Sequence, residues 1–374
     1  MKVLFLAPHL STGGMPAFLL KRIQALQQYT DVEVFVFEWK QYATSYVVQR
    51  DQIQNILGKD HFYSCGGVWD DHANVEKNQK TLIDFCYKNK IDIIHIEEIP
   101  ENFDHFNPFN SEFQKELYDV KHPWRIIETP HSMGFNPLSS KKIQPDGYAC
   151  VTESHAYSTY NFNINKSCLI SFPVDPNIQS NISRDSILED MGYRTKGEFH
   201  IINIGLWTEG KNQKYAIEIA RQLWEKYKWS YIFHFIGNQA DNFKKYWEPI
   251  MSDLPPNVVV HGERNDTDKF LKIADAMLFT STYECNPLVL KEGISNELKV
   301  LAFNLGHYGE EYIPFINKLN GNLHDDSNLV INTLHSPNKY ILGDYSKSVE
   351  EFANKHILFY KLLLDDEASR GSYN

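Results

Sequence analysis

The sequence has few cysteines, no long hydrophobic run and no signal-peptide pattern. Its five cysteines include no Cys-x-x-Cys pair, so we expect reduced thiols and neither a disulfide framework nor a zinc knot. No apolar run approaches the length that crosses a bilayer, and VLFLA before Pro8 is too short for the apolar core of a signal peptide. We therefore expect a cytoplasmic protein that makes at most peripheral contact with a membrane.

Positive charge is also in short supply. The formal net charge is −11, so no global positive field is available to attract a nucleic acid backbone or an anionic membrane surface. We expect no nucleic acid partner, although one or two cations and a helix N-terminus can still hold a small anionic ligand. The 374 residues, 42% of them hydrophobic, are enough for two domains with separate cores.

The first half of the sequence alternates strands with helices. A short apolar strand precedes the Ser/Thr/Gly loop STGG, and apolar positions at helical spacing follow Pro16. Buried strands are then predicted at 32–39, 91–96, 125–131 and 147–155. Strands separated by helices indicate parallel pairing in a doubly wound α/β sheet, whose strand ends carry ligand-binding loops.

The same alternation restarts after SFPVDPN (171–177), which has two prolines in seven residues. It predicts strands at 199–205, 231–237, 258–262 and 276–281, with a helix from about 213 to 227. We therefore predict an N-terminal domain over residues 1–173 and a C-terminal domain over residues 174–346. Residues 347–374 are predicted to form a helix that packs back on the first domain.

The segment YECNPLVLKE (283–292) predicts a loop that leads into a helix. Asn286 is a suitable N-cap and Pro287 is suited to the first helical turn. The amides of Leu288 and Val289 then point out of the helix N-terminus, where a phosphate group binds well.

Two glutamates, Glu284 and Glu292, flank this helix N-terminus. Carboxylates repel phosphate, so we expect them to bind neutral hydroxyl groups. A ligand with a diphosphate in the middle and a polyol at each end fits this arrangement, and a nucleotide sugar is such a ligand. The alternative is that both glutamates are solvated charges, since this spacing often occurs by chance.

A longer stretch around these glutamates resembles a known family. VVVHGERNDTDKFLKIADAMLFTSTYECNPLVLKE is similar to the C-terminal signature of retaining glycosyltransferases of family 4. The matching parts occur in the family's order and spacing, as Gly262, Ala274-Asp275, Ser281, Glu284 and Glu292.

The resemblance extends over most of the chain. INIGLWTEGK resembles the family's V-G-R-x-x-x-x-K-G segment, with Gly205 and Lys211 at the glycine and the lysine. IDIIHIEE resembles a strand with a histidine at His95, and ETPHSMGF resembles the segment whose histidine, here His131, lines the cleft. STGGMP, which contains Gly13 and Gly14, is similar to the glycine loop after the first strand.

This resemblance implies a GT-B fold, with two Rossmann-like domains facing across a cleft, the first binding acceptor and the second binding donor. It implies that Glu284 binds the donor sugar, Glu292 the ribose, Lys211 the diphosphate, and backbone near Gly262 and Glu263 the base. His131 would orient the sugar, which makes His131, Glu284 and Lys211 the catalytic candidates. The implied donor-binding set is Gly13, Gly14, Gly205, Lys211, Gly262, Glu263, Glu284, Asn286, Pro287, Leu288, Val289 and Glu292.

The sequence departs from the family pattern at two places. Leu206 stands where the family usually has an arginine, so one of two expected phosphate cations is missing, and Lys214 or Arg264 is a candidate substitute. The segment 300–313 follows the family's glycine-rich pattern only loosely, which weakens an expected phosphate contact at Gly306 and His307.

Two further motifs have competing interpretations. Glu97 and Glu98 follow a predicted strand and are weak candidates for acceptor contact, although acidic residues at strand ends are usually solvated. DTD (266–268) has the spacing of a metal-binding D-x-D, but it precedes a helix, and capping by Asp266 or Thr267 explains it better. We predict no essential metal and no cofactor.

The leading hypothesis is a retaining glycosyltransferase that moves a sugar from a UDP-, GDP- or ADP-sugar to a hydroxyl of a glycan or glycolipid acceptor. A second hypothesis, motivated by Leu206, is a catalytically silent relative that binds nucleotide sugar or glycan as a partner subunit. A GT-B enzyme that uses inorganic phosphate as acceptor ranks last, because nothing in the sequence resembles its cofactor lysine site.

Overall fold

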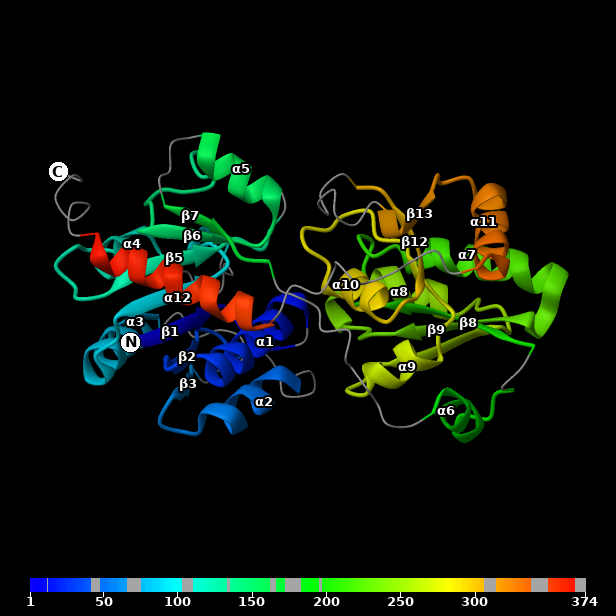
Figure 1. Cartoon of the computed structure of the whole chain (residues 1–374), viewed down its shortest axis with the longest axis horizontal. Helices are drawn as coiled ribbons and strands as arrows, with labels where there is room; N and C mark the ends of the chain where they lie inside the picture. Colours follow the sequence, from blue (N-terminus) through cyan, green and yellow to red (C-terminus); the bar gives the residue numbers. More distant parts are fainter. Residues whose placement is uncertain are drawn as a thin grey trace. The chain divides into compact units, whose positions relative to one another are not determined.

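The chain divides into two compact units (Figure 1), the first comprising residues 1–173 with 348–374 and the second residues 174–347. The structure is a computed structural model and describes residues 1–11, 13–41, 48–65, 75–102, 110–132, 135–161, 166–171, 183–194, 197–305, 314–337 and 349–366. Most of the proline stretch predicted as the boundary, 171–177, lies outside the described residues.

The first unit is built on a seven-stranded parallel sheet with the strand order β3-β2-β1-β4-β5-β6-β7. The strands are β1 (Lys2–Ala7), β2 (Glu33–Glu38), β3 (Phe62–Ser64), β4 (Ile93–Glu97), β5 (Arg125–Thr129), β6 (Gly147–Cys150) and β7 (Ser167–Leu169). The helices are α1 (Gly14–Tyr29), α2 (Val48–Leu57), α3 (Val75–Asn89), α4 (Ser111–Leu117), α5 (Glu153–Asn161) and α12 (Val349–Asp365), with a 3-10 turn η3 (Pro100–Asn102). The central strands are buried on both faces, as their continuous apolar runs predict.

The C-terminal helix α12 packs on the face of this sheet that also carries α1. Phe352 of α12 meets Phe18 of α1 edge to face, with ring centroids 6.0 Å apart. At Gly147 of β6 a Cβ atom would lie only 2.8 Å from the ring of Phe359, so the helix approaches the strand closely because this position has no side chain.

The second unit is built on a six-stranded parallel sheet with the strand order β10-β9-β8-β11-β12-β13. The strands are β8 (Phe199–Ile204), β9 (Tyr231–Ile236), β10 (Val258–Gly262), β11 (Ala276–Phe279), β12 (Lys299–Phe303) and β13 (Ile316–Leu319). The helices are α6 (Arg184–Asp190), α7 (Gln213–Tyr227), α8 (Lys244–Met251), α9 (Thr267–Ile273), α10 (Leu288–Ser295) and α11 (Leu323–His335), with 3-10 turns η4 (Lys228–Ser230) and η5 (Asp241–Phe243).

Alternate residues of these strands fill two separate cores, one on each face of the sheet. Ile202 and Met277 pack with α6, α9 and α10, whereas their neighbours Ile201 and Leu278 pack with α7 and α11. α7 and α11 lie side by side on one face (Figure 1).

The predicted fold class, two doubly wound parallel-sheet domains, is confirmed. Every strand predicted from the apolar runs is present and begins within two residues of its predicted start, and the helix predicted at 213–227 is α7. The first helix begins at Gly14 and not after Pro16, because a proline in the first turn needs no amide hydrogen bond. Strands β3, β7, β12 and β13 were not predicted.

The strand order reverses once in each sheet, between β1 and β4 and between β8 and β11. Ligands of open α/β sheets bind at the carboxyl ends of the strands beside such a reversal. In the second unit this rule selects the loops that follow β8 and β11, and in the first unit it selects the loops that follow β1 and β4.

Candidate functional site

Backbone and hydroxyl contacts tie the two loops at the reversal in the second sheet together. The hydroxyl of Thr280, just past β11, donates to the backbone oxygen of Asn212 at 2.9 Å and lies 3.2 Å from that of Lys211. The amide of Thr282 donates to the backbone oxygen of Gly210 at 2.8 Å. The loop after β8 is therefore fixed against the loop after β11.

The loop after β8 carries Lys211 and the loop after β11 carries Glu284, and these two residues are in direct contact. The ammonium group of Lys211 donates to Oε1 of Glu284, forming an ion pair between residues 73 positions apart in the chain. The side chain of Lys211 is 31% exposed and that of Glu284 is 10% exposed. The two residues that the resemblance assigns to diphosphate and sugar thus share one partly open site.

Two glycines, Gly205 and Gly237, follow neighbouring strands next to this lysine. A Cβ atom at Gly205 would lie 3.5 Å from Cδ of Lys211, so the aliphatic part of the lysine side chain lies over Gly205. At Gly237, which follows β9 and has φ +147, a Cβ atom would lie 1.9 Å from the backbone oxygen of Gly205. Only glycine permits this close approach of the two strand ends.

The N-terminus of α10 lies next to the pair in the chain, and its cap differs from the prediction. Pro287, not Asn286, occupies the N-cap position, and the Pro287 side chain makes no capping hydrogen bond. Its extended backbone, with ψ at 105°, is the cap conformation, and its carbonyl accepts from Leu290 at 3.1 Å. Leu288 and Val289 are consequently the first two helical residues, whose amides have no partner within the helix.

Glu292 lies one turn further along α10 and is half-buried. The other residues assigned to nucleotide binding, Gly262 and Glu263, follow β10, which is separated from β8 by β9. Gly262 has φ +68, and its carbonyl accepts from the amide of Gly237 at 2.8 Å. Gly262 therefore turns the chain at the end of β10. Its hydrogen bond joins this turn to Gly237, which in turn lies against the backbone of Gly205.

Arg264, one of the two candidate substitutes for the missing arginine, forms an ion pair with Asp266. Its guanidinium forms two hydrogen bonds of 2.7 Å to the carboxylate of Asp266, and this contact lowers the pKa of Asp266 to about 2. Asp266 holds the predicted N-cap position of α9, but its carboxylate bonds Arg264 and not a helix amide. Within the described ranges no three histidine, cysteine, aspartate or glutamate side chains form a group that could hold a metal ion.

Leu206 stands at the position of the missing arginine, and its backbone makes a structural contact. The carbonyl of Leu206 accepts from the side-chain amide of Gln213 at 3.0 Å. Lys214, the other suggested substitute cation, is exposed at the start of α7. Gly306 and His307 lie outside the described residues.

A second cluster occupies the carboxyl end of the first sheet. Nε2 of His131, two residues past β5, lies 2.8 Å from Oε2 of Glu97 at the end of β4. The other carboxylate oxygen of Glu97 accepts from Nη1 of Arg22 on α1. Arg22 and Glu97 have no exposed side-chain surface, whereas His131 is 17% exposed. In this conformation only His131 of the three reaches the surface, and Glu97 does not present itself to an acceptor.

Glu98 occupies a different environment from Glu97. It is half-buried with φ +78, and its carboxylate accepts from the hydroxyl of Ser132 at 2.8 Å. Gly13 caps α1 with φ +131, and Gly14 is the first residue of the helix. The loops after β1, β4 and β5 therefore carry the predicted residues of the first unit.

His95 lies beneath this cluster as a neutral, structural residue. Its Nε2 is 2.6 Å from the hydroxyl of Thr129 and 3.4 Å from Nη1 of Arg22, and its Nδ1 is 2.7 Å from the hydroxyl of Tyr360 on α12. Burial, and then the charge of Arg22, hold the pKa of His95 well below its usual range. Because Arg22 can only donate, Nε2 is the acceptor and Nδ1 carries the proton.

Three histidines form a hydrogen-bonded row across β8, β9 and β10 that the sequence reasoning missed. Nδ1 of His200 lies 3.0 Å from Nε2 of His234, whose Nδ1 lies 2.9 Å from Nε2 of His261. Burial lowers the pKa of His200 to about 4 and that of His234 to about 2, so both are neutral near pH 7. One histidine inside each of three apolar strands, FHIINI, YIFHFI and VVVHG, was the available signal.

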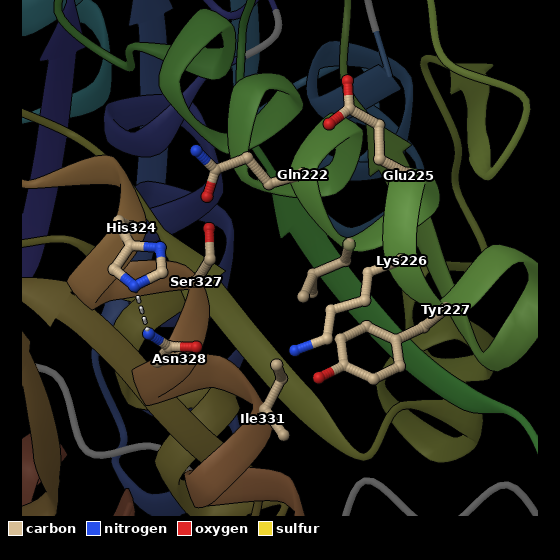
Figure 2. A pocket seen from close by; sticks show the side chains of 9 residues that line it. Gln222, Glu225, Lys226, Tyr227, His324, Ser327, Asn328 and Ile331 are labelled. Carbon is tan, nitrogen blue, oxygen red and sulfur yellow. Dashed lines mark hydrogen bonds between the residues drawn. The ribbon is translucent and has the colours of Figure 1, made fainter.

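A pocket of about 440 Å³ lies away from these residues, between α7 and α11 (Figure 2). Lys226 and Tyr227 line it from α7, and Ser327 and Asn328 line it from α11. None of the predicted site residues contributes to it. Among the residues that the structure describes, no helix is long and apolar enough to cross a membrane.

A known protein family matches much of the second unit. Residues 192–330 match a family model described as glycosyl transferases group 1. This stretch contains Lys211, Glu284 and the whole of α10. No curated protein sequence matches the chain.

Solved structures match over nearly the whole chain. A glycosyltransferase from Rickettsia africae has 13% identity and a TM-score of 0.67, covering 98% of this chain and 99% of that one. HepE of Anabaena, solved with UDP and glucose, has 13% identity and a TM-score of 0.67, covering 100% of both chains. Sucrose-phosphate synthase of Thermosynechococcus elongatus has 12% identity and a TM-score of 0.66, covering 99% and 96%. The chain therefore has the GT-B fold that these glycosyltransferases share.

Proposed function

We propose that the protein is a glycosyltransferase that takes a sugar from a nucleotide diphosphate and transfers it to a hydroxyl group. The observation that carries this proposal is the Lys211–Glu284 pair at the strand-order reversal of the second sheet, next in sequence to the open N-terminus of α10. A cation, a helix N-terminus and a carboxylate in one site complement the diphosphate and the hydroxyl groups of a nucleotide sugar.

The ion pair has a clear electrostatic use in such a site. An isolated Glu284 would repel the diphosphate. The positive charge of Lys211 compensates the negative charge of Glu284 and so removes this repulsion. The lysine ammonium has three donors, so it can keep Glu284 in place while it donates to a phosphate oxygen. Glu284 still has acceptor positions for sugar hydroxyls, and Glu292 on the next turn of α10 is proposed to bind the ribose.

Cleavage of the sugar–phosphate bond then depends on stabilising the departing diphosphate. We assign this role to Lys211 and to the amides of Leu288 and Val289. The contacts of Thr280 and Thr282 hold the loop that carries Lys211 in place. The resemblance to retaining enzymes leads us to propose front-face attack with retention, in which His131 orients the sugar and the leaving phosphate accepts the acceptor proton. The proposal requires neither a metal nor a cofactor.

The donor and acceptor are proposed by class. UDP-sugars are the first donors to test, because HepE of Anabaena, which has the same fold, was solved with UDP and glucose. GDP- and ADP-sugars follow, since Gly262 and Glu263, the residues assigned to the base, do not distinguish them. A glycan or glycolipid supplies the acceptor hydroxyl, and the reaction is proposed to occur in the cytoplasm.

Leu206 favours one alternative, a relative that binds nucleotide sugar as a partner subunit without turning it over. Its side chain supplies no charge, and Arg264 is held by Asp266. In this alternative the site has fewer cations for the diphosphate than the family pattern provides, which suffices for binding but is too weak for catalysis.

Hydrolysis of the donor separates these two functions. The protein is incubated without metal with UDP-glucose, GDP-mannose and ADP-glucose, and release of free nucleoside diphosphate is measured. We expect slow hydrolysis by the wild type and a loss of about 100-fold or more in Lys211→Ala, the size expected for removing one transition-state donor. Glu284→Ala removes the acceptor proposed to bind the sugar hydroxyls, and we expect its hydrolysis rate to fall as well.

Lys245→Ala and Glu209→Ala are matched controls, because both side chains are exposed residues of the same unit. They are expected to hydrolyse the donor at the wild-type rate. Binding of a donor without turnover, even with a broad acceptor panel, would favour the silent relative. Loss of activity on addition of a chelator would show that the metal-independent mechanism is wrong.

A further inference from the structure

Arg22 carries a charge that must be balanced inside the first unit. Its side chain has no exposed surface, and its guanidinium carbon lies 4.4 Å from the ring centroid of Phe18 and 5.5 Å from that of Phe5. A guanidinium does not lose its proton in proteins, so a buried arginine needs an anion in contact with it. Among the described residues the carboxyl group in contact with Arg22 is that of Glu97.

The other polar groups near Arg22 cannot balance its charge. Thr129 offers only a neutral hydroxyl at 3.4 Å from Nη2 of Arg22, and His95 is a neutral imidazole. Glu97 must therefore be ionised, and an ionised carboxylate only accepts hydrogen bonds.

This requirement decides which nitrogen of His131 carries the proton. Nε2 of His131 lies 2.8 Å from Oε2 of Glu97, so a neutral His131 must donate its Nε2–H to that oxygen. Nδ1 is then left as an acceptor. Among the described residues no group is hydrogen-bonded to Nδ1, and the ring is 17% exposed.

We propose that Arg22 and Glu97 are positioning residues that lock His131 as the Nε2–H tautomer, so that His131 presents Nδ1 as an acceptor to a hydroxyl of the substrate. Glu97 thereby acts behind His131 and does not contact the acceptor itself. The assignment of the hydroxyl to donor sugar or acceptor rests on the proposed glycosyltransferase function. The tautomer itself does not rest on that function.

Glu97→Gln should reverse the tautomer. Arg22 only donates, so the new side-chain amide at position 97 must turn its carbonyl oxygen toward Arg22 and its NH₂ group toward His131. Nε2 of His131 then has to accept, and the ring proton moves to Nδ1. The side chain of His131 would present a donor where the wild type presents an acceptor.

Two-bond ¹H–¹⁵N NMR of ¹⁵N-histidine-labelled full-length protein reads this directly. Spectra are taken over a range of alkaline pH, and the tautomer is read where the His131 ring signals no longer change with pH. The His131 signals among the 15 histidines are those that disappear in His131→Gln. We expect the Nε2–H pattern in the wild type, in Arg22→Lys and in the control Glu98→Gln, and the Nδ1–H pattern in Glu97→Gln.

An Nδ1–H pattern in the wild type would overturn the proposal, even if Glu97→Gln did not fold. An unchanged tautomer in a folded Glu97→Gln would overturn it as well. If the wild type transfers sugar, kcat of Glu97→Gln should fall about tenfold, the value of one lost hydrogen bond, and Glu97→Asp should restore part of it. A correct tautomer without any turnover would refute the proposed function and leave the positioning role intact.

Discussion

The two units place a glutamate–cation pair at the same location, the carboxyl end of a parallel sheet, but bury it to different extents. Arg22 and Glu97 have no exposed side-chain surface, whereas Lys211 is 31% exposed and can reach a ligand. A buried pair depends on both partners, because either charge alone would be left in an apolar environment. A partly exposed pair costs little to break, so its value lies in what it binds.

The largest effect should come from removing the buried cation. Arg22→Met leaves the Glu97 carboxylate buried without a counter-charge, and we expect a loss of about 3–5 kcal/mol in the free energy of unfolding. Chemical denaturation of the first unit measures this loss. The double variant Arg22→Met, Glu97→Gln should recover most of it, and a double variant as unstable as the single one would show that the charge is not the cause.

Acid should destabilise the second unit through its neutral histidines. Burial lowers the pKa of His234 to about 2 from an ordinary value of 6.5, so as pH falls below 6.5 the unfolded chain takes up a proton first. This contribution is therefore fully present above pH 6.5 and is lost progressively toward pH 2. Urea denaturation measures the free energy of unfolding at both pH values. Between pH 7.5 and pH 5.0, the stability of His234→Leu relative to the wild type should rise by about 2 kcal/mol. If the difference in the free energy of unfolding between His234→Leu and the wild type did not change with pH, the low pKa of His234 would be contradicted.

The contacts that tie the two loops together should contribute a smaller amount. Thr280→Val removes the hydroxyl that bonds the carbonyl of Asn212 at 2.9 Å, and we expect a loss of about 1 kcal/mol. Donor hydrolysis should also fall, because Lys211 is no longer held against Glu284. Thr280→Ser keeps the hydroxyl and serves as the control, so equal losses in both variants would assign the effect to packing.

The smallest stability effect is expected at the partly exposed pair. Lys211→Met should change the free energy of unfolding by no more than about 1 kcal/mol while donor hydrolysis is lost. Thermal unfolding and the hydrolysis assay on the same preparation measure both. A stability loss as large as that of Arg22→Met would show that the two pairs do not differ as described.

Much of this arrangement could be predicted from residue patterns. Apolar runs and helical spacing located the central strands and α7, since their signals come from burial on sheets and helices. Lys211 and Glu284 were paired through the family resemblance, because nothing in the spacing of residues 73 positions apart shows that two loops meet. The cap of α10 was misplaced by one residue because Pro287 caps through its backbone, which no side-chain preference reveals.

Arg22 shows what the sequence reasoning overlooked. A charged residue in a helix is usually solvated, but Arg22 lies four positions from both Phe18 and Leu26, on the apolar face of α1. The position of Arg22 among these apolar residues indicated that its charge is buried. Its partner could not be read, because Glu97 arrives from a strand 75 residues later through the topology of the sheet.

The C-terminal helix α12 has a consequence for how the chain is made. Its Tyr360 hydroxyl bonds His95, and its Phe359 fills the space above Gly147, so it completes the core of the first unit. On the ribosome, residues 174–347 emerge before that helix does. We therefore expect the second unit to fold while the first is still incomplete, so that the order of folding is the reverse of the order of synthesis.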